Sequence, residues 1–178
     1  MRVLAGIYKS KKIATINSSE TRPMMSKVRE AIFNSIQFMI EGKDVLDLYS
    51  GSGSLGIEAL SRGANYVTFV ELSKECTLIL KKNVENLSNN LTIVTSPVKS
   101  FIQNSINKYH LIFYDPPFEL DVSQVNEEIL IIENILNDSG LLIIHRHKSS
   151  EDLKFSKNYE LHREKNYGQS KILILRRI

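Results

Sequence analysis

The tetrapeptide Asp115-Pro116-Pro117-Phe118 brings together residue types that could do chemistry. Two consecutive prolines fix the backbone, so the carbonyl of Pro116 is left free of strand pairing and points in a set direction. With the Asp115 carboxylate it provides two acceptors, enough to hold both hydrogens of a planar exocyclic amine. Phe118 adds a flat ring on which the base that bears this amine could stack. The tetrapeptide therefore predicts a site at which an amine is bound and made reactive.

An amine attached to an aromatic ring is a poor nucleophile because its lone pair is delocalised into the ring. Hydrogen bonds to its N–H groups localise that pair, and Asp115 would stabilise the positive charge that develops on nitrogen as a bond to carbon forms. Most of the rate would come from holding the nitrogen, the carbon it attacks and the leaving atom in line. We expect no bound metal, because none is required and metal-ligand spacing is absent among the histidines, His110, His145, His147 and His162.

A glycine-rich segment from Asp47 to Gly56 stands where a predicted strand becomes a predicted helix. Glycines at 51, 53 and 56 permit a sharp turn and let a ligand lie against the main chain at a helix N-terminus. Glu71 ends the next strand, where a carboxylate can accept hydrogen bonds from both ribose hydroxyls. These features suit NAD as well as S-adenosylmethionine. Asp47 favours S-adenosylmethionine, since its carboxylate can receive the ammonium group of a methionine but would repel a pyrophosphate. The alternative is that Asp47 has a purely structural role as a helix-capping or turn residue.

The elements that must position these groups alternate along the chain. Apolar stretches predict strands at 43–48, 66–70, 91–94, 111–114 and 141–144, and helical spacing predicts helices at 54–62, 74–87, 97–102 and 125–136. Apolar strands separated by helices indicate an α/β fold with a parallel sheet covered on both faces. Because ligands bind outside the carboxyl ends of such strands, we expect the glycine-rich segment and the tetrapeptide to share one crevice.

Three local features complete the prediction. Residues 138–140, Asp-Ser-Gly, predict a turn before the strand at 141–144. Residues 160–163 and 171–175 flank Tyr167-Gly168-Gln169, which indicates an antiparallel hairpin. Near the start, apolar residues followed by lysines indicate a small hairpin, and a helix is expected over 27–40.

The composition fits one globular domain of 178 residues, with 42% hydrophobic and 24% charged residues. Cys76 is the single cysteine, so a disulfide scaffold is excluded and a reducing, cytoplasmic setting is the expectation. We also expect a soluble protein that does not enter a membrane. No apolar run approaches the roughly 20 residues that cross a bilayer, and the first residues lack the apolar core of a signal peptide.

Positive charge is concentrated near the start of the chain. Residues 1–29 carry seven basic side chains and one acidic side chain, a local charge of +6, whereas the whole chain has a net charge of +3. Such asymmetry is typical of a protein that approaches polyphosphate, and a solvated lysine-rich surface is the alternative. We interpret residues 1–178 as a single domain in which residues 1–21 form a basic N-terminal extension.

The sequence resembles the RsmD-type methyltransferases over essentially its whole length. The shared features are residues 2–6 with the following lysines, Arg22-Pro23 with residues 28–34, the glycine-rich segment through Ala64, the tetrapeptide, and Tyr167-Gly168. The resemblance implies a Rossmann-like class I fold, with a mostly parallel seven-stranded sheet, an antiparallel C-terminal hairpin and a small basic N-terminal β-hairpin. It also implies methyl transfer from S-adenosylmethionine to the N2 amine of a guanine in 16S ribosomal RNA, within an assembled or assembling 30S subunit, by a monomer.

The resemblance assigns three groups of residues by position. The amine is bound and activated by Asp115, Pro116, Pro117 and Phe118. The cofactor is bound by Asp47, Tyr49, Gly51, Gly53, Glu71, Leu72 and Val98. The RNA phosphates are contacted by Arg2, Lys9, Lys11, Lys12, Arg22 and Arg29.

The sequence departs from the family pattern at three places. Met24-Met25-Ser26 stand where threonines and an aspartate are usual, and His145 replaces a glutamate that often ends the fifth strand. Pro97-Val98 follow the third strand, where a polar residue commonly reaches the adenine. We therefore expect the adenine to be bound by backbone groups and apolar packing. None of these changes removes a group that the chemistry needs.

Other functions share part of this pattern. An amino methyltransferase for adenine N6 in nucleic acid, or for a protein glutamine, would use the same tetrapeptide, because each acceptor is a planar amine with two N–H groups. The short basic arm favours folded RNA, since no inserted domain is long enough to read a DNA major groove. An NAD-dependent dehydrogenase would leave residues 115–118 unexplained. A noncatalytic RNA-binding module would leave both motifs without a role.

Overall fold

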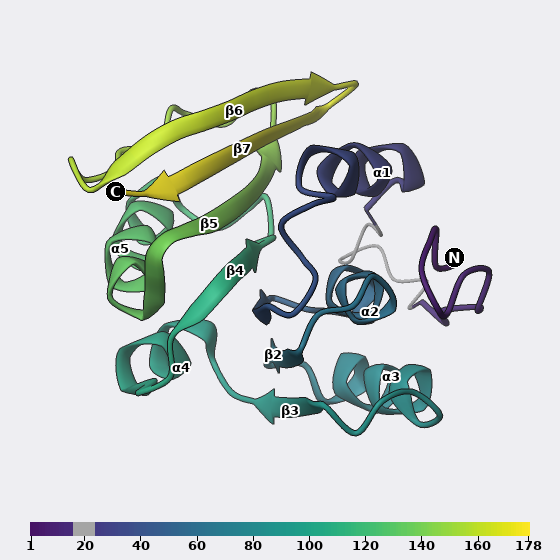
Figure 1. Ribbon diagram of the computed structural model, residues 1–178. Coiled ribbons are helices and arrows are strands. Elements are labelled where there is room, and N and C mark those ends of the chain that lie inside the picture. Colours follow the sequence, from purple (N-terminus) through teal and green to yellow (C-terminus); the bar gives the residue numbers. More distant parts are fainter. Residues whose placement is uncertain (16–23) are drawn as a thin grey trace.

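A seven-stranded sheet forms the centre of the protein, with strand order β3-β2-β1-β4-β5-β7-β6 (Figure 1). The computed structural model describes residues 1–15 and 24–178. The strands are β1 (Asp44–Leu48), β2 (Tyr66–Glu71), β3 (Leu91–Thr95), β4 (Tyr109–Tyr114), β5 (Leu136–His147), β6 (Tyr159–Tyr167) and β7 (Ser170–Arg177). Strands β1 to β5 pair in parallel, and β7 pairs antiparallel with both β5 and β6. The predicted α/β class and the C-terminal hairpin are confirmed.

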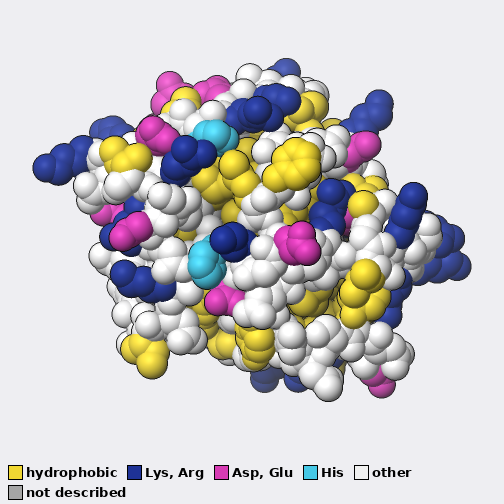
Figure 2. Space-filling model, viewed as in Figure 1, with side chains coloured by type: hydrophobic (Ala, Val, Ile, Leu, Met, Phe, Trp, Pro, Cys, Tyr) yellow, Lys and Arg dark blue, Asp and Glu magenta, His cyan; other side chains and the backbone are white. Residues whose placement is uncertain are grey.

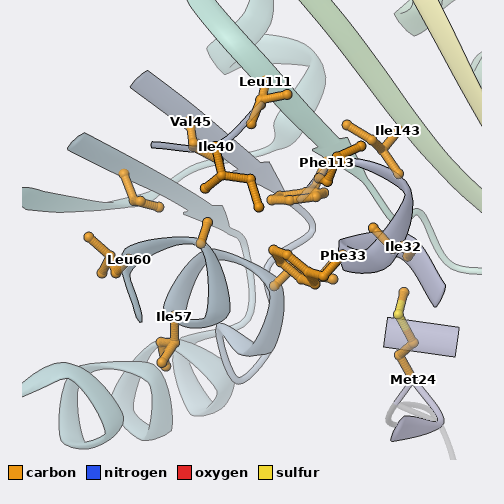
Figure 3. Packing of buried hydrophobic residues seen from close by; sticks show 14 of the residues in the cluster. Met24, Ile32, Phe33, Ile40, Val45, Ile57, Leu60, Leu111, Phe113 and Ile143 are labelled. Carbon is orange, nitrogen blue, oxygen red and sulfur yellow. The ribbon is translucent and has the colours of Figure 1, made fainter. Parts of the chain in front are cut away.

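Helices cover both faces of the sheet (Figure 1). They are α1 (Ser26–Ser35), α2 (Ser54–Ser61), α3 (Lys74–Val84), α4 (Val98–Asn104) and α5 (Val122–Ile132), followed by the short 3-10 helix η1 (Glu133–Ile135). Because successive strand residues point to opposite faces, Val45 packs with α1, α2 and α3, whereas Leu46 packs with α4 and α5. On the first face, the ring of Phe33 lies 5.5 Å from that of Phe113 (Figure 3).

The strand order reverses direction next to β1, which lies between β2 and β4. The last residue of β1, Leu48, is in register with Val70 of β2 and with Tyr114 of β4. The three strands therefore end at the same edge, and the chain segments that leave them emerge side by side. A parallel sheet binds its ligands at such a position.

All five predicted helices differ somewhat in their bounds, and two of them differ most. The helix expected over 27–40 ends at Ser35, whose hydroxyl donates to the Ala31 carbonyl at 2.9 Å and so competes with the helical backbone. The chain then turns, with the Met39 amide bonded to the Ile36 carbonyl. The helix expected over 125–136 begins at Val122 instead, because Asp121 caps it by accepting from the Ser123 amide at 2.8 Å.

The turn predicted at residues 138–140 is wrong, because these residues lie within β5. Pairing with β4 begins at Leu136 opposite Tyr109 and resumes at Leu141 opposite Leu111, so the additional residues form an irregularity in the strand. Ser139 takes the left-handed conformation there, with φ of 60°. The sequence Asp-Ser-Gly therefore marks a bulge in β5. Bulges and turns favour the same residue types, so the sequence alone did not distinguish them.

The N-terminal hairpin is present in reduced form, as one antiparallel bridge between Arg2 and Lys12. Two backbone hydrogen bonds, Val3 N to Lys11 O at 3.0 Å and Ser10 N to Val3 O at 2.9 Å, close it. We call residues 1–14 the N-terminal arm. In the ranges that the structure describes, no helix is both long enough and apolar enough to cross a membrane.

Candidate active site

The segment after β1 turns sharply before α2 begins. Tyr49, Gly51 and Gly53 all have positive φ, at 58°, 53° and 81°. At Gly53 the positive φ strains any other residue, and a Cβ would lie 2.3 Å from a methyl carbon of Leu80, which would have to shift. At Gly51, by contrast, a Cβ would meet no described atom within 4 Å. The main chain of Gly51 therefore faces open space in which a ligand can approach it closely.

Asp47 lies beneath the first turn of α2 and is only 1% exposed. Its Oδ2 accepts a hydrogen bond from the Gly56 amide at 2.8 Å, so the helix-capping contact expected as the alternative is present. Burial raises the pKa of Asp47 well above its ordinary value, and the charges of Asp115 and Glu71 raise it further. The carboxylates of Glu71 and Asp115 therefore lie close enough to Asp47 to disfavour its charged form.

Glu71 joins the end of β2 to the glycine-rich turn. Its Oε2 accepts from the Gly51 amide and its Oε1 from the Ser73 amide, both at 2.8 Å. A carboxylate oxygen has two lone pairs, so each oxygen can accept a further hydrogen bond from a ribose hydroxyl. Leu72 next to it is 61% exposed, whereas the side chain of Val98 lies in the core at 4%. Val98 therefore has only its backbone to offer a ligand.

Asp115 leaves β4 with a side chain that is 28% exposed, and its Oδ1 lies 2.7 Å from Nδ1 of His145. The Nε2 of His145 in turn lies 2.8 Å from the hydroxyl oxygen of Ser170. Phe118 is 38% exposed and meets the rings of His145 and His147 edge-on, at 5.3 and 5.6 Å. These two contacts hold the Phe118 ring in place while part of it remains exposed.

The side chain of Arg146 fixes the backbone that follows the tetrapeptide. It donates to the carbonyls of Pro117 at 2.9 Å and Leu120 at 3.1 Å, whereas the carbonyl of Pro116 accepts no hydrogen bond from the described residues. Pro116 is itself buried, and the use of its carbonyl by a ligand stays a prediction. A cavity of 540 Å³ opens beside this loop. Sequence analysis missed Arg146, which carries no motif of its own.

Glu128 of α5 is a second residue that sequence analysis missed. It is 4% exposed and accepts hydrogen bonds from the hydroxyls of Tyr114 at 2.7 Å and Tyr49 at 3.0 Å. Burial raises the pKa of Glu128, and burial together with the Glu128 charge raises the pKa of both tyrosine hydroxyls. The network fixes the Tyr49 ring at the start of the glycine-rich turn.

The predicted phosphate contacts are divided by the structure. Arg2, Lys9 and Lys12 are exposed and Lys11 is half-buried, all on the N-terminal arm. In Figure 2, Lys and Arg side chains project from the side on which Figure 1 places this arm. Arg22 lies outside the described residues.

The predicted phosphate contact by Arg29 is wrong. Arg29 is 0% exposed and donates to the Arg2 carbonyl and to the Met1 sulfur, and burial lowers the pKa of its guanidinium. Its role is to anchor the arm from beneath. In the sequence, Arg29 looks like a charged residue on the exposed face of a helix. Its burial depends on the arm that covers it, which the sequence does not reveal.

The arm is fixed to the helices around the glycine-rich turn. Glu58 of α2, fully buried, accepts from the amides of Leu4 at 2.7 Å and Ala5 at 3.0 Å. Asn83 of α3 donates to the carbonyls of Ala14 at 3.0 Å and of Ser52 at 2.9 Å. A cavity of 790 Å³ between the arm and α3 is lined by Met1, Arg2, Leu4, Lys12, Ile13, Ala14, Ser26, Lys82 and Asn83. None of these described lining residues is acidic.

Comparison with known proteins agrees with this arrangement. Residues 1–176 match the family described as Conserved hypothetical protein 95. The ribosomal RNA small subunit methyltransferase D of Haemophilus influenzae is 34% identical, over 94% of this chain and 89% of that protein. Its namesake from Escherichia coli is 31% identical, over 95% and 86%.

Solved structures show the same architecture. The structure of yhhF from Escherichia coli has a TM-score of 0.90 and 30% identity, and the match covers 99% of this chain and 97% of that one. SMU.776, whose structure is complexed with SAH, has a TM-score of 0.72 at 21% identity over 84% of this chain and 48% of that one, which shows the fold alone. The fold is thus the Rossmann-like fold of S-adenosylmethionine-dependent methyltransferases, and the chain belongs to the Conserved hypothetical protein 95 family, that of the RsmD-type methyltransferases.

Proposed function

We propose that this protein, a ribosomal RNA methyltransferase, transfers the methyl group of S-adenosylmethionine to the exocyclic N2 amine of a guanine in 16S ribosomal RNA. The observation that carries the proposal is the register of Leu48 with Tyr114. The glycine-rich turn and the tetrapeptide begin at the next residues of these neighbouring strands, so a cofactor on one faces an amine held by the other.

The residues present fit S-adenosylmethionine. A cation is favoured beside Asp47, whose charged form is disfavoured by burial and by the charges of Asp115 and Glu71, and this cofactor carries both an ammonium group and a sulfonium. Glu71 offers acceptors to the ribose, and Gly51 leaves its main chain open. When bound, the cofactor supplies a methyl carbon whose bond to sulfur breaks with the electron pair left on sulfur.

The protein's own residues act on the acceptor. The Asp115 carboxylate and the Pro116 carbonyl accept the two amine hydrogens, which localises the nitrogen lone pair toward the methyl carbon. As the nitrogen bonds to carbon it becomes positively charged and must lose one hydrogen. Asp115 accepts this proton and, being 28% exposed, releases it to water. Phe118 stacks on the guanine ring and limits its orientation.

The RNA backbone binds the N-terminal arm and the adjoining cavity. Arg2 and Lys12 of the arm and Lys82 of α3 line this cavity, and Lys9 and Lys11 extend the positive charge along the arm. Because Glu58 and Asn83 fix the arm to the helices next to the glycine-rich turn, phosphates bound there set the position of the target base. The protein acts as a monomer on RNA within an assembled or assembling 30S subunit.

The test is transfer of tritiated methyl groups to naked ribosomal RNA and to assembled small subunits, followed by nucleoside analysis. The proposal expects N2-methylguanosine from the wild type and about a hundred-fold less or lower still from Asp115→Ala, which removes the acceptor for the amine. Label in N6-methyladenosine or in protein glutamine would identify a different acceptor. Stoichiometric cofactor binding without transfer to any RNA would contradict the enzymatic function.

A further inference from the structure

His145, at the end of β5, connects the catalytic carboxylate to a buried serine. Its Nδ1 lies 2.7 Å from Oδ1 of Asp115, and its Nε2 lies 2.8 Å from Oγ of Ser170 on β7. His145 and Ser170 are 6% and 7% exposed, so water does not replace either contact. Both ring nitrogens are therefore engaged, and Nδ1 must carry the hydrogen when the ring donates to the Asp115 carboxylate.

We propose that His145 is a positioning residue for Asp115: its Nδ1–H donates to Oδ1 of Asp115, and its Nε2 accepts the hydroxyl hydrogen of Ser170. The inference rests on the proposed function, in which Asp115 holds the acceptor amine. With Oδ1 fixed by the imidazole, Oδ2 is the oxygen that faces the amine. A carboxylate held in this way does not lose rotamer freedom again when substrate binds, so the geometry for transfer exists beforehand.

The contact with Asp115 is specific to one of two similar histidines. His147 also meets the edge of Phe118, at 5.6 Å against 5.3 Å for His145, and its Nδ1 also lies close to a serine hydroxyl, that of Ser149 at 2.6 Å. Within residues 1–15 and 24–178, however, His147 contacts no carboxylate. Comparison of the two positions therefore separates an effect on Asp115 from an effect on Phe118.

The first experiment compares His145→Leu, His145→Asn and His147→Leu in transfer to ribosomal RNA. Loss of a hydrogen bond to a charged group predicts a kcat about ten- to a hundred-fold lower for His145→Leu. The dissociation constants for cofactor and RNA should change less than about three-fold, because His145 touches neither in the proposed complex. His145→Asn can place its side-chain N–H where Nδ1–H stood, so most of the activity should return.

Two kinetic results would overturn the inference. One is a His147→Leu variant whose kcat falls as much as that of His145→Leu. Both histidines contact Phe118, so the loss would then come from Phe118 and not from Asp115. The other is a His145→Asn variant no better than His145→Leu, since the N–H facing Asp115 would then have no role.

A second measurement needs no turnover and uses the wild-type protein. Nitrogen-15 NMR of the labelled His145 ring should show a proton on Nδ1 and none on Nε2, and Asp115→Ala should abolish this preference. A wild-type ring protonated on Nε2 would reject the arrangement even if every variant misfolded. If the wild type methylates no guanine, the proposed function fails by itself, and the NMR result still decides whether His145 orients Asp115.

Discussion

The amide nitrogen of Gly51 lies 2.8 Å from Oε2 of Glu71, so the turn that follows β1 is fastened to the carboxylate that ends β2. Positive φ at Gly51 aims this amide at the neighbouring strand. Residues 20 positions apart in the sequence thereby form one wall of the candidate cofactor site.

Glu71→Ala should weaken cofactor binding much more than RNA binding. The substitution removes the acceptors for the ribose and also frees the Gly51 and Ser73 amides. Loss of hydrogen bonds to a charged acceptor predicts a cofactor dissociation constant about 10- to 100-fold higher by calorimetry. Glu75→Ala, at an exposed position on α3, is the matched control. Equal effects on cofactor and RNA would place the ribose elsewhere.

Asp115→Ala should abolish most methyl transfer and leave cofactor binding nearly intact, because in the proposed mechanism Asp115 acts on the acceptor amine. Removal of a general base predicts a kcat lower by about 10²- to 10⁴-fold, measured with saturating cofactor. The exposed neighbour Glu119→Ala should behave as the wild type. Turnover that is unchanged in Asp115→Ala would remove this residue from the mechanism.

Asp47→Asn should stabilise the free protein increasingly as pH rises. The pKa of Asp47 is raised in the folded protein by burial, so its contribution to stability is complete below the unfolded value of about 4 and declines as pH rises through the folded value. Asparagine keeps an acceptor for the Gly56 amide and cannot ionise. Urea unfolding between pH 4 and 8 should show a growing advantage for the variant, and a constant difference would contradict the assignment. Cofactor affinity should fall, because the ammonium partner is lost.

Replacement of Lys9, Lys11 and Lys12 by glutamine should weaken RNA binding and flatten its dependence on salt. Each lost phosphate contact lowers the slope of log K against log salt by roughly one unit. Lys82→Gln alone should lower it by up to one unit. Lys43→Gln and Lys108→Gln are controls, since both precede strands β1 and β4 and so lie at the opposite edge of the sheet. An unchanged slope in the arm variant would exclude the arm as the RNA contact.

Glu58→Ala should destabilise the fold by about 3 kcal/mol in urea unfolding. The buried carboxylate accepts from Leu4, Ala5 and the Arg62 guanidinium at 2.7, 3.0 and 2.8 Å, and its removal leaves these donors buried beside Arg29. Glu30→Ala on α1 is exposed and should change stability by less than about 0.5 kcal/mol. A small loss in Glu58→Ala would mean that the arm detaches without cost.

The position of the candidate site could be predicted from the sequence, because it depends on topology. Apolar strands without polar alternation indicate a parallel sheet, and parallel strands end at one edge. The residues after Leu48 and Tyr114 therefore had to meet once the two strands were neighbours. The ends of β1, α2 and β3 were also predicted to within a residue, since glycine or a change of hydrophobic period marks each of them.

The partners of the site residues could not be predicted, because they depend on register and tertiary packing. Ser170 reaches His145 only because β7 pairs antiparallel with β5 and places Ile172 opposite His145. Arg29 and Glu58 have the residue types of surface helices, and only the arm that covers them makes them interior. A motif marks where a backbone must bend, whereas a buried polar pair has no local signature.

Asn83 has a consequence that extends to both ligands at once. Its amide group joins the carbonyl of Ser52, in the glycine-rich turn, to that of Ala14, at the end of the arm. In the proposed complex, a shift of the turn on cofactor binding would be transmitted to the arm, and reciprocity would then require RNA to change cofactor affinity by the same factor. Asn83→Ala would remove this shared amide, so the affinities for cofactor and RNA should then influence each other less than in the wild type.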